Sequence, residues 1–331
     1  MPYLRALLLP AVAALALGVG ITWPLALAPG TTAAWSPFAE GHLAAMGFAA
    51  RTPPWSTHLL VAGWPSGVDF RPVLWPWGLV AAATGQTLAY ASLLILTPIM
   101  NLVGGAWCGR ILGLDPRGAA AFGAILAFCP WTRTTLQNGQ PEQAWLGLGA
   151  ALVGALVWTT PRPWILAALP LTFLAGVAAP HVTIASLVLA GTWALHGTRA
   201  EPRRLATIFL AAVGAALVVG WHGAGLVDDS LFAPLGRLDD HLGPALKHSA
   251  LWTDLVTPAR LPPGKGPWVV HLGYVGLPLL LAAFVAPKSA RYAVAAGVVC
   301  LVLALGENGP LALVGGRLHP SAVPYRFTLG A

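Results

Sequence analysis

The chain has 331 residues, of which 57% are hydrophobic and only 9% are Asp, Glu, Lys or Arg. Soluble domains carry about a quarter charged residues, so the composition, with its strongly positive mean hydropathy, indicates a membrane protein. The formal charge of +7 does not point to nucleic acid, because the basic residues are scattered and form no run interleaved with aromatic residues.

Apolar segments recur along the whole chain. Since roughly 20 mostly apolar residues cross a bilayer as a helix, we expect spans near residues 5–28, 86–108, 118–130, 142–159, 164–180, 182–196, 205–222, 268–286 and 292–305. We add a possible interfacial helix from Trp75 to Gly85. The prediction is an all-α, polytopic transmembrane bundle of about 8–10 spans, forming a single domain over residues 1–331.

The first apolar run has a second interpretation. Arg5 precedes it and Ala26-Leu27-Ala28 resembles a cleavage site, as in a secretory signal peptide. We favour a span, because the run is long for a signal peptide and further spans follow.

The distribution of charge predicts the orientation. Basic residues gather at the N-terminus and in short turns on one side, which the positive-inside rule makes cytoplasmic: Arg5, Arg110, Arg117, Arg162, Arg199, Arg203, Arg204, Lys288 and Arg291. The two long connections, residues 29–75 and 223–267, then face outward and contain most of the acids. We therefore expect a protein of the bacterial inner (plasma) membrane with a cytoplasmic N-terminus.

Cysteine and acid patterns predict no metal centre. Cys108, Cys129 and Cys300 fall in or beside apolar runs, where a thiol behaves as a small hydrophobe. The second long loop contains several possible ligands whose spacing matches neither an EF-hand nor a zincin: Asp228, Asp229, Asp239, Asp240, His241 and Asp254. We predict no metal ligands and no certain cofactor, leaving open a divalent cation.

The first long loop holds the candidate catalytic residues, Glu40 and Asp69, together with His42, His58 and Arg71. A carboxylate beside a membrane surface can act as a general base towards a hydroxyl group. Two plainer interpretations stay open: Glu40 caps a short interfacial helix, and Asp69 forms a local ion pair with Arg71.

Polar residues in two later segments are candidate substrate contacts. The segment from Thr132 to Trp145 is expected to join two spans as an outward loop, whose amides, Gln140 among them, could recognise sugar hydroxyls. Arg133 and Glu142 of this loop are further candidate substrate contacts. Arg326, near the end of the chain, could meet a phosphate at the lipid headgroup level. Polar turns and interfacial cations are common, so each is also explained without a substrate.

The order of several short motifs resembles the C-type superfamily of multi-spanning membrane glycosyltransferases, in particular its YfhO-like bacterial members. The motifs are, in order, FAEGHLAAM, WPSGVDFRPVLWP, GGAWCGRILGLD, GAAAFGAILAFCPWTRTTLQNGQPEQAW, HSALWTDLVTP, HLGYVGLPLLLAA, ALGENGP and VPYRF. The resemblance covers most of the chain and depends on the order of the motifs, because each one is short.

The resemblance implies transfer of a sugar from a polyprenyl-phosphate carrier to an extracytoplasmic glycan, lipid or protein acceptor, with inversion at the anomeric carbon. Glu40 corresponds to the acid that activates the acceptor. Asp69 would orient the acceptor or hold Arg71, and His42 or His58 would tune Glu40. Arg71, Arg133 or Arg326 would offset the charge of the departing phosphate. Membrane lipids are the other expected partner.

The sequence departs from the family pattern in two ways. The first-loop acid is Glu40 where such families often have Asp, and the chain stops at Ala331 where relatives continue with further spans. A fragment or a degenerate member is therefore an expected alternative.

Two other functional classes remain open. A non-catalytic membrane subunit would keep the helices but not need Glu40. A lipid or sugar transporter is less favoured, because the expected spans are nearly free of the charged residues that mark transport paths.

Overall fold

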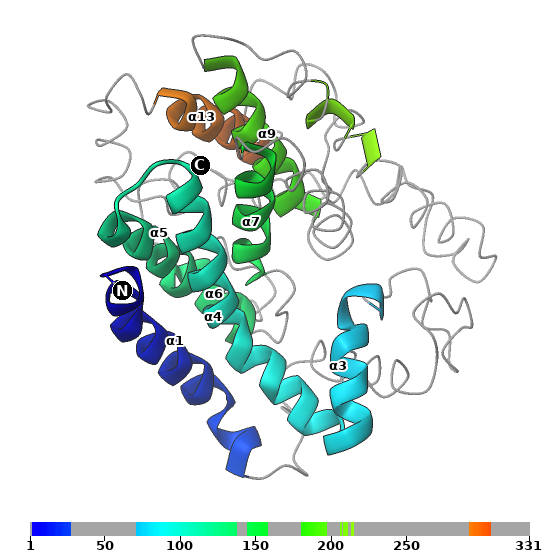
Figure 1. Cartoon of the computed structure of the whole chain (residues 1–331). Helices are drawn as coiled ribbons and strands as arrows, with labels where there is room; N and C mark the ends of the chain where they lie inside the picture. The colour runs from blue at the N-terminus through cyan, green and yellow to red at the C-terminus, as the bar shows by residue number, and fades with distance from the viewer. Residues whose placement is uncertain are drawn as a thin grey trace, which may run out of the picture. The chain divides into compact units, whose positions relative to one another are not determined.

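The computed structural model describes residues 2–27, 71–137, 144–157, 180–196, 206, 208–210, 213–214 and 291–305. Every element with defined bounds in these ranges is an α-helix, which confirms the all-α class (Figure 1). The chain divides into two compact units, residues 1–179 with 214–231 and residues 180–213 with 232–331. The single domain expected over residues 1–331 stays a prediction.

The helices of the first unit follow the apolar runs of the sequence. They are α1 (Pro2–Leu27), α3 (Arg71–Thr84), α4 (Gln86–Ile111), α5 (Pro116–Phe128), α6 (Pro130–Gln137) and α7 (Leu146–Val157). The starts and ends of α1, α4 and α5 lie within a few residues of the expected spans. Within the described ranges, α4 is the one helix long and apolar enough to cross a membrane.

A glycine makes the corner between α3 and α4. Gly85 has φ 91°, a conformation that favours glycine, and its N–H donates to the carbonyl of Ala81 at 2.8 Å. The helix expected from Trp75 to Gly85 is thus present, and it begins earlier, at Arg71.

The turn between α4 and α5 is closed by caps at both ends. Gly113, with φ 91°, follows α4, and Arg110 Nη1 donates to the Leu114 carbonyl at 2.5 Å. Asp115 is the N-cap of α5: its Oδ1 accepts from Gly118 N–H at 2.8 Å, and Pro116 occupies the first turn. The chain therefore reverses sharply, and α5 returns along α4.

Close contacts between small residues define the direction of α5 against α4. A Cβ on Gly105 would lie 2.8 Å from the Gly123 Cα, and one on Gly109 would lie 3.0 Å from the Ala119 Cα. In these contacting pairs, a higher residue number in α4 goes with a lower residue number in α5. The two helices are therefore antiparallel, with their backbones closer than larger side chains would permit.

Helix α7 packs on α4 in the opposite sense. Gly147 lies against the backbone of Met100 and Asn101, and a Cβ on Gly154 would lie 2.6 Å from the Trp107 ring. In these contacting pairs the residue numbers of α7 and α4 rise together, so α7 runs parallel to α4.

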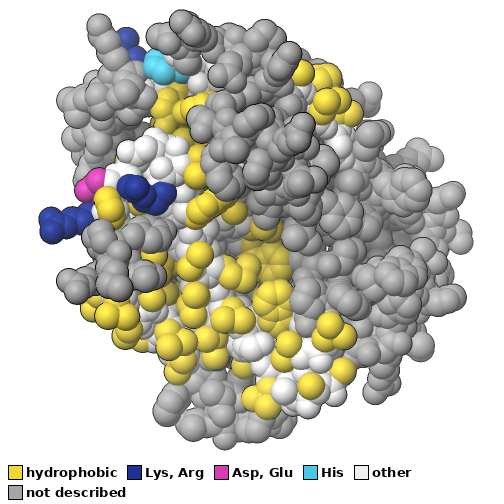
Figure 2. Space-filling model, viewed as in Figure 1, with side chains coloured by type: hydrophobic (Ala, Val, Ile, Leu, Met, Phe, Trp, Pro, Cys, Tyr) yellow, Lys and Arg dark blue, Asp and Glu magenta, His cyan; other side chains and the backbone are white. Residues whose placement is uncertain are grey.

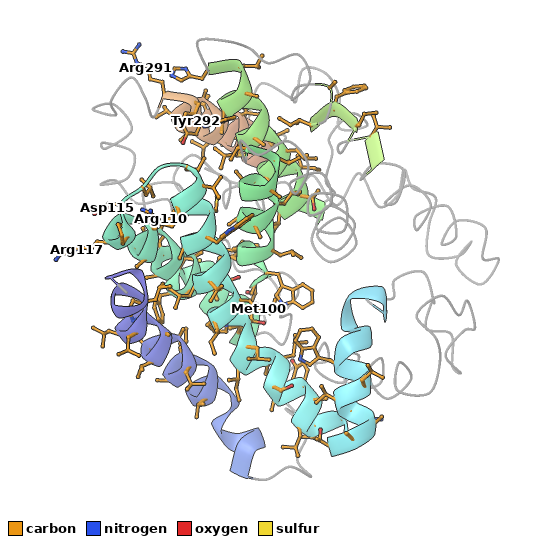
Figure 3. All side chains as sticks on the ribbon, in the orientation of Figure 1. Met100, Arg110, Asp115, Arg117, Arg291 and Tyr292 are labelled. Atoms are coloured by element: carbon orange, nitrogen blue, oxygen red, sulfur yellow. The ribbon has the colours of Figure 1, made fainter. Side chains whose placement is uncertain are left out.

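Helix α1 packs antiparallel to α4. A Cβ on Gly18 would lie 2.7 Å from the Ile95 Cα, and Ala14 shares a buried cluster with Leu102 and Ala127. The start of α1, the end of α4, the start of α5 and the end of α7 consequently share one end of the unit. We call this the basic end, because it contains Arg110 and Arg117 beside Asp115 (Figure 3).

Many large apolar side chains are exposed on the outer surfaces of these helices. Leu9 is 78% exposed and Leu8 68% exposed on α1. Other exposed apolar side chains continue along α3, α4 and α5: Leu79, Val80, Leu88, Leu96, Val103, Ile125 and Phe128. Figure 2 shows hydrophobic side chains covering much of the visible described face, with Arg and Asp gathered beside them.

The second unit contains α9 (Pro180–His196) and α13 (Arg291–Leu305), which pack together. Their bounds agree with the expected spans 182–196 and 292–305. The rings of His196 and Tyr292 lie 6.1 Å apart, so the end of α9 meets the start of α13. The expected spans 164–180 and 268–286 lie almost wholly outside the described residues, and helical residues near 206–214 fall in the span expected at 205–222.

Replacing Gly123 by alanine should destabilise the first unit. The new Cβ would collide with the Leu102 carbonyl and lie 2.9 Å from Ala106 N, both backbone atoms that cannot move aside. Overpacking of this kind costs about 1–3 kcal/mol. Thermal unfolding in detergent should show a lower midpoint for Gly123→Ala. Gly20→Ala is the control, because that site has nothing within 4 Å, and an equal loss there would contradict the packing described.

Candidate functional site

The residues predicted as a catalytic and substrate site fall mostly outside the described ranges. This applies to Glu40, Asp69, His42, His58, Gln140, Glu142 and Arg326. Arg71 begins α3 and Arg133 lies in α6, and for these two only the backbone is described. The structure therefore neither brings these residues together nor separates them, and their roles stay predictions.

A buried polar cluster does exist beside this segment, centred on Asn101 of α4. The Asn101 side chain is completely buried. Its Nδ2 lies 2.6 Å from the Ala144 carbonyl and 3.3 Å from the Leu126 carbonyl, and its Oδ1 accepts from Gly147 N–H at 2.7 Å. One carboxamide thus joins the end of α5 to the start of α7.

Thr132 extends the cluster into α6. Its hydroxyl donates to the Leu126 carbonyl at 2.8 Å and lies 3.2 Å from Asn101 Nδ2, from which it accepts. Thr132 Oγ1 is also 3.4 Å from Cys129 Sγ. The hydroxyl therefore helps to satisfy a carbonyl of the last turn of α5, where the helix can no longer do so.

Two tryptophans cover the cluster on the side towards the start of α4. Trp145 is 3% exposed, and its indole N–H donates to Thr97 Oγ1 at 3.2 Å. Thr97 in turn donates to the Leu93 carbonyl at 2.8 Å. Trp77 of α3 contacts Trp145 with ring centroids 6.0 Å apart. This pair links α3 to the residues that precede α7.

The cluster lies well inside the length of α4. Asn101 precedes the last residue of that helix, Ile111, by ten positions, which is about 15 Å at the rise of an α-helix. Helix α5 runs from the basic end to the level of Asn101, and α7 begins near Asn101 and runs back towards the basic end. With 13 and 12 residues, these helices are only about 18–20 Å long. We call the helices α5, α6 and α7 together the polar hairpin.

Helix α6 was not expected, because the sequence suggested a loop from Thr132 to Trp145. Its start coincides with Pro130, which suits a first helical position. The buried residues of this short helix, Trp131, Thr132, Thr135 and Leu136, recur at helical spacing. The helix therefore packs one face inward, and the run of polar residues concealed this pattern.

A polar stretch of the sequence separates α6 from Ala144. Residues 138–143, which contain the candidates Gln140 and Glu142, lie between Gln137 at the end of α6 and Ala144 beside Asn101. The structural residues of the cluster, Asn101 and Thr97, were not among the sequence predictions. A signal was available, since an asparagine in an apolar span normally has a buried partner. Within the described ranges, no group of three His, Cys, Asp or Glu could hold a metal.

No protein-family model matches the chain, and no curated protein or solved structure matches it.

Replacing Asn101 by leucine should strongly destabilise the first unit. Leucine has the same branching and number of side-chain heavy atoms as asparagine, although it is larger, and it leaves the Ala144 carbonyl and Gly147 N–H buried without their partner. Each such group costs about 1–3 kcal/mol. Thermal unfolding in detergent should show a large fall in the unfolding midpoint of Asn101→Leu. Thr84→Val is the control, because it removes an exposed hydroxyl bonded to the Val80 carbonyl, and its midpoint should fall only slightly. Equal effects would mean that the Asn101 bonds contribute little.

Proposed function

We propose that the chain is a polytopic inner-membrane protein in which α1, α4 and the polar hairpin stand across the bilayer, with the basic end in the cytoplasm. The length and apolar character of α4 support this proposal. So do the exposed apolar side chains of α1 and α4 and the position of Arg110 and Arg117 at the end where α1 begins.

In this frame the polar hairpin is a discontinuous membrane element. The hydrocarbon core is about 30 Å thick, so neither α5 nor α7 is long enough to cross it, and Asn101 lies near its middle. Non-helical backbone is tolerated at that depth only where protein or a water-filled cavity surrounds it. Hydrogen bonds of Asn101 and Thr132 to the Leu126 and Ala144 carbonyls and to the Gly147 N–H support this proposal.

We propose further that the protein transfers a sugar from a polyprenyl-phosphate donor to an extracytoplasmic hydroxyl. The observation that carries this proposal is the polar hairpin: a satisfied polar break within apolar helices, followed by a stretch rich in amides and containing an acid. Breaks in membrane helices are where membrane proteins build sites for polar substrates. A donor held in the membrane by its lipid would reach such a break laterally.

Glu40 is the proposed base. It would accept the proton of the acceptor hydroxyl as that oxygen bonds to the anomeric carbon, while the bond from this carbon to the phosphate oxygen breaks and its electron pair leaves with the phosphate. A guanidinium would stabilise the leaving phosphate. One displacement inverts the anomeric carbon.

A non-catalytic membrane subunit is the second candidate function. It is favoured by the same structural facts, since the Asn101 cluster could serve folding alone. Transport is less favoured, because α4 has no acid or base between Gln86 and Cys108, and such residues mark ion or proton paths.

The proposed orientation predicts the labelling of two single-cysteine variants in a background without native cysteines. Arg117 lies at the basic end, and Thr84 is exposed near the opposite end of α4. In intact cells a membrane-impermeant maleimide should label Thr84→Cys and spare Arg117→Cys. Inverted vesicles should give the reverse pattern. Labelling of both from one side would contradict a crossing by α4.

The proposed chemistry predicts that Glu40→Gln abolishes sugar transfer, because the amide cannot accept a proton. The measurement is transfer from radiolabelled polyprenyl-phosphate sugars in purified membranes at equal expression, with a loss of about 100-fold or more. Glu201→Gln is the matched control, since that acid lies in an expected cytoplasmic turn. Full activity of Glu40→Gln, or no transfer with any donor, would favour the subunit.

A further inference from the structure

We infer that Pro98 is a hinge within α4 and that Trp145 is the latch that holds this hinge closed. Helix α3 and the part of α4 before Pro98 form one arm. The arm swings between the closed form described above and an open form in which Trp77 has moved away from Trp145. The hinge is a property of the first unit alone and does not depend on the proposed transfer of sugar.

The hydrogen-bond ladder of α4 is interrupted at Pro98, which is buried in the interior of the helix. Because proline has no N–H, it cannot donate to the Leu94 carbonyl, and its ring crowds that oxygen. The hydroxyl of the preceding residue, Thr97, donates to the Leu93 carbonyl at 2.8 Å, and side-chain bonds of this kind often bend helices. Kinks in long helices concentrate at prolines, so α4 resists bending least at this point.

After Pro98, α4 is fixed to the polar hairpin by close backbone contacts. Gly147 of α7 lies against the backbone of Met100 and Asn101, and Gly123 of α5 approaches the α4 backbone equally closely. The Asn101 carboxamide adds a hydrogen bond to Gly147 N–H at 2.7 Å. Backbones packed this tightly cannot shift without collision. The second part of α4, α5 and α7 therefore form one rigid group, which we call the body.

Before Pro98, α4 is joined to α3 by the corner at Gly85, whose N–H donates to the Ala81 carbonyl at 2.8 Å (Figure 1). Since this hydrogen bond closes the corner, α3 moves with the first part of α4. Helix α1 meets this part through Gly18, which lies against the Ile95 backbone. A glycine has no side chain to block sliding, and small sliding movements of packed helices accompany many domain motions.

Trp145 connects the body to the arm beside the hinge. It belongs to the body, because its carbonyl accepts from Leu148 N–H of α7 at 3.1 Å. Its indole N–H donates to Thr97 Oγ1 at 3.2 Å, and its ring centroid lies 6.0 Å from that of Trp77 on the arm. A hydrogen bond and an aromatic pair are each modest interactions. They hold the arm closed and still permit it to open.

Opening of the arm changes what covers the Asn101 cluster. In the closed form Trp145 is 3% exposed, and together with Trp77 it covers the cluster on the side towards the start of α4. Once Trp77 moves away, Trp145 and the Thr97 hydroxyl become accessible from that side. The arm is therefore a lid over one side of the cluster.

Spin-label distances between pairs of introduced cysteines, in the full chain without its native cysteines, test the hinge. Leu79→Cys with Ile125→Cys joins the arm to the body, and both side chains are exposed. This pair should give two distances, one for each form. Two control pairs at exposed positions should each give a single distance: Leu79 with Leu88 within the arm, and Leu114 with Ile125 within the body.

Three variants then test the parts of the device. Pro98→Ala restores the missing N–H and should reduce the two distances to one. Pro116→Ala is the matched control, because that proline lies in the first turn of α5, where no helical hydrogen bond is lost, and both distances should remain. Trp145→Phe keeps an aromatic ring without the N–H, and should raise the ratio of open to closed form about fivefold.

Four results would overturn the inference. One narrow distance between positions 79 and 125 would exclude the hinge, and two distances between 79 and 88 would place the movement at Gly85 instead. Two distances that persist in Pro98→Ala would show that Pro98 is not the pivot, and an unchanged ratio in Trp145→Phe would remove the latch. Pro98→Leu replaces Pro98→Ala if the latter does not fold. Absence of sugar transfer leaves these distances unaffected, so the hinge and the proposed function fail separately.

Discussion

The carboxamide of Asn101 is the interaction on which the first unit depends. It is fully buried and meets the end of α5, the start of α7 and the hydroxyl of Thr132 at the same point. A break between helices in an apolar interior leaves backbone donors and acceptors that water cannot reach. A single side chain with donors and an acceptor can satisfy several of them, so the chain can break there at little cost.

Close packing by glycine makes this network geometrically possible. Gly147 contacts the backbone of Met100 and Asn101, and Gly104 faces Gly147 across the same interface. Because glycine has no side chain, α7 approaches α4 closely enough for a short carboxamide to reach its first turn. These glycines also lower the intrinsic stability of the helices that contain them, because glycine has a low helix propensity. Polar network and small-residue packing therefore support each other.

The helices and their limits could largely be predicted from the sequence, whereas the polar cluster could not. The long apolar runs at 86–108 and 118–130 indicated α4 and α5. One polar residue in an apolar run, such as Asn101, does not reveal its partners, and these come from up to 46 residues away along the chain. The proposed catalytic residue, Glu40, is known from the sequence alone.

The sequence by itself determined the all-α class, the apolar character of the helices and the concentration of charge in their connections, because these follow from composition and local periodicity. Only the tertiary structure decided that α5 ends and α7 begins beside Asn101 of α4, with the two helices running in opposite directions. It also decided that Thr132 lies in a helix. Those features depend on which surfaces meet, and contacts between distant residues leave no local pattern.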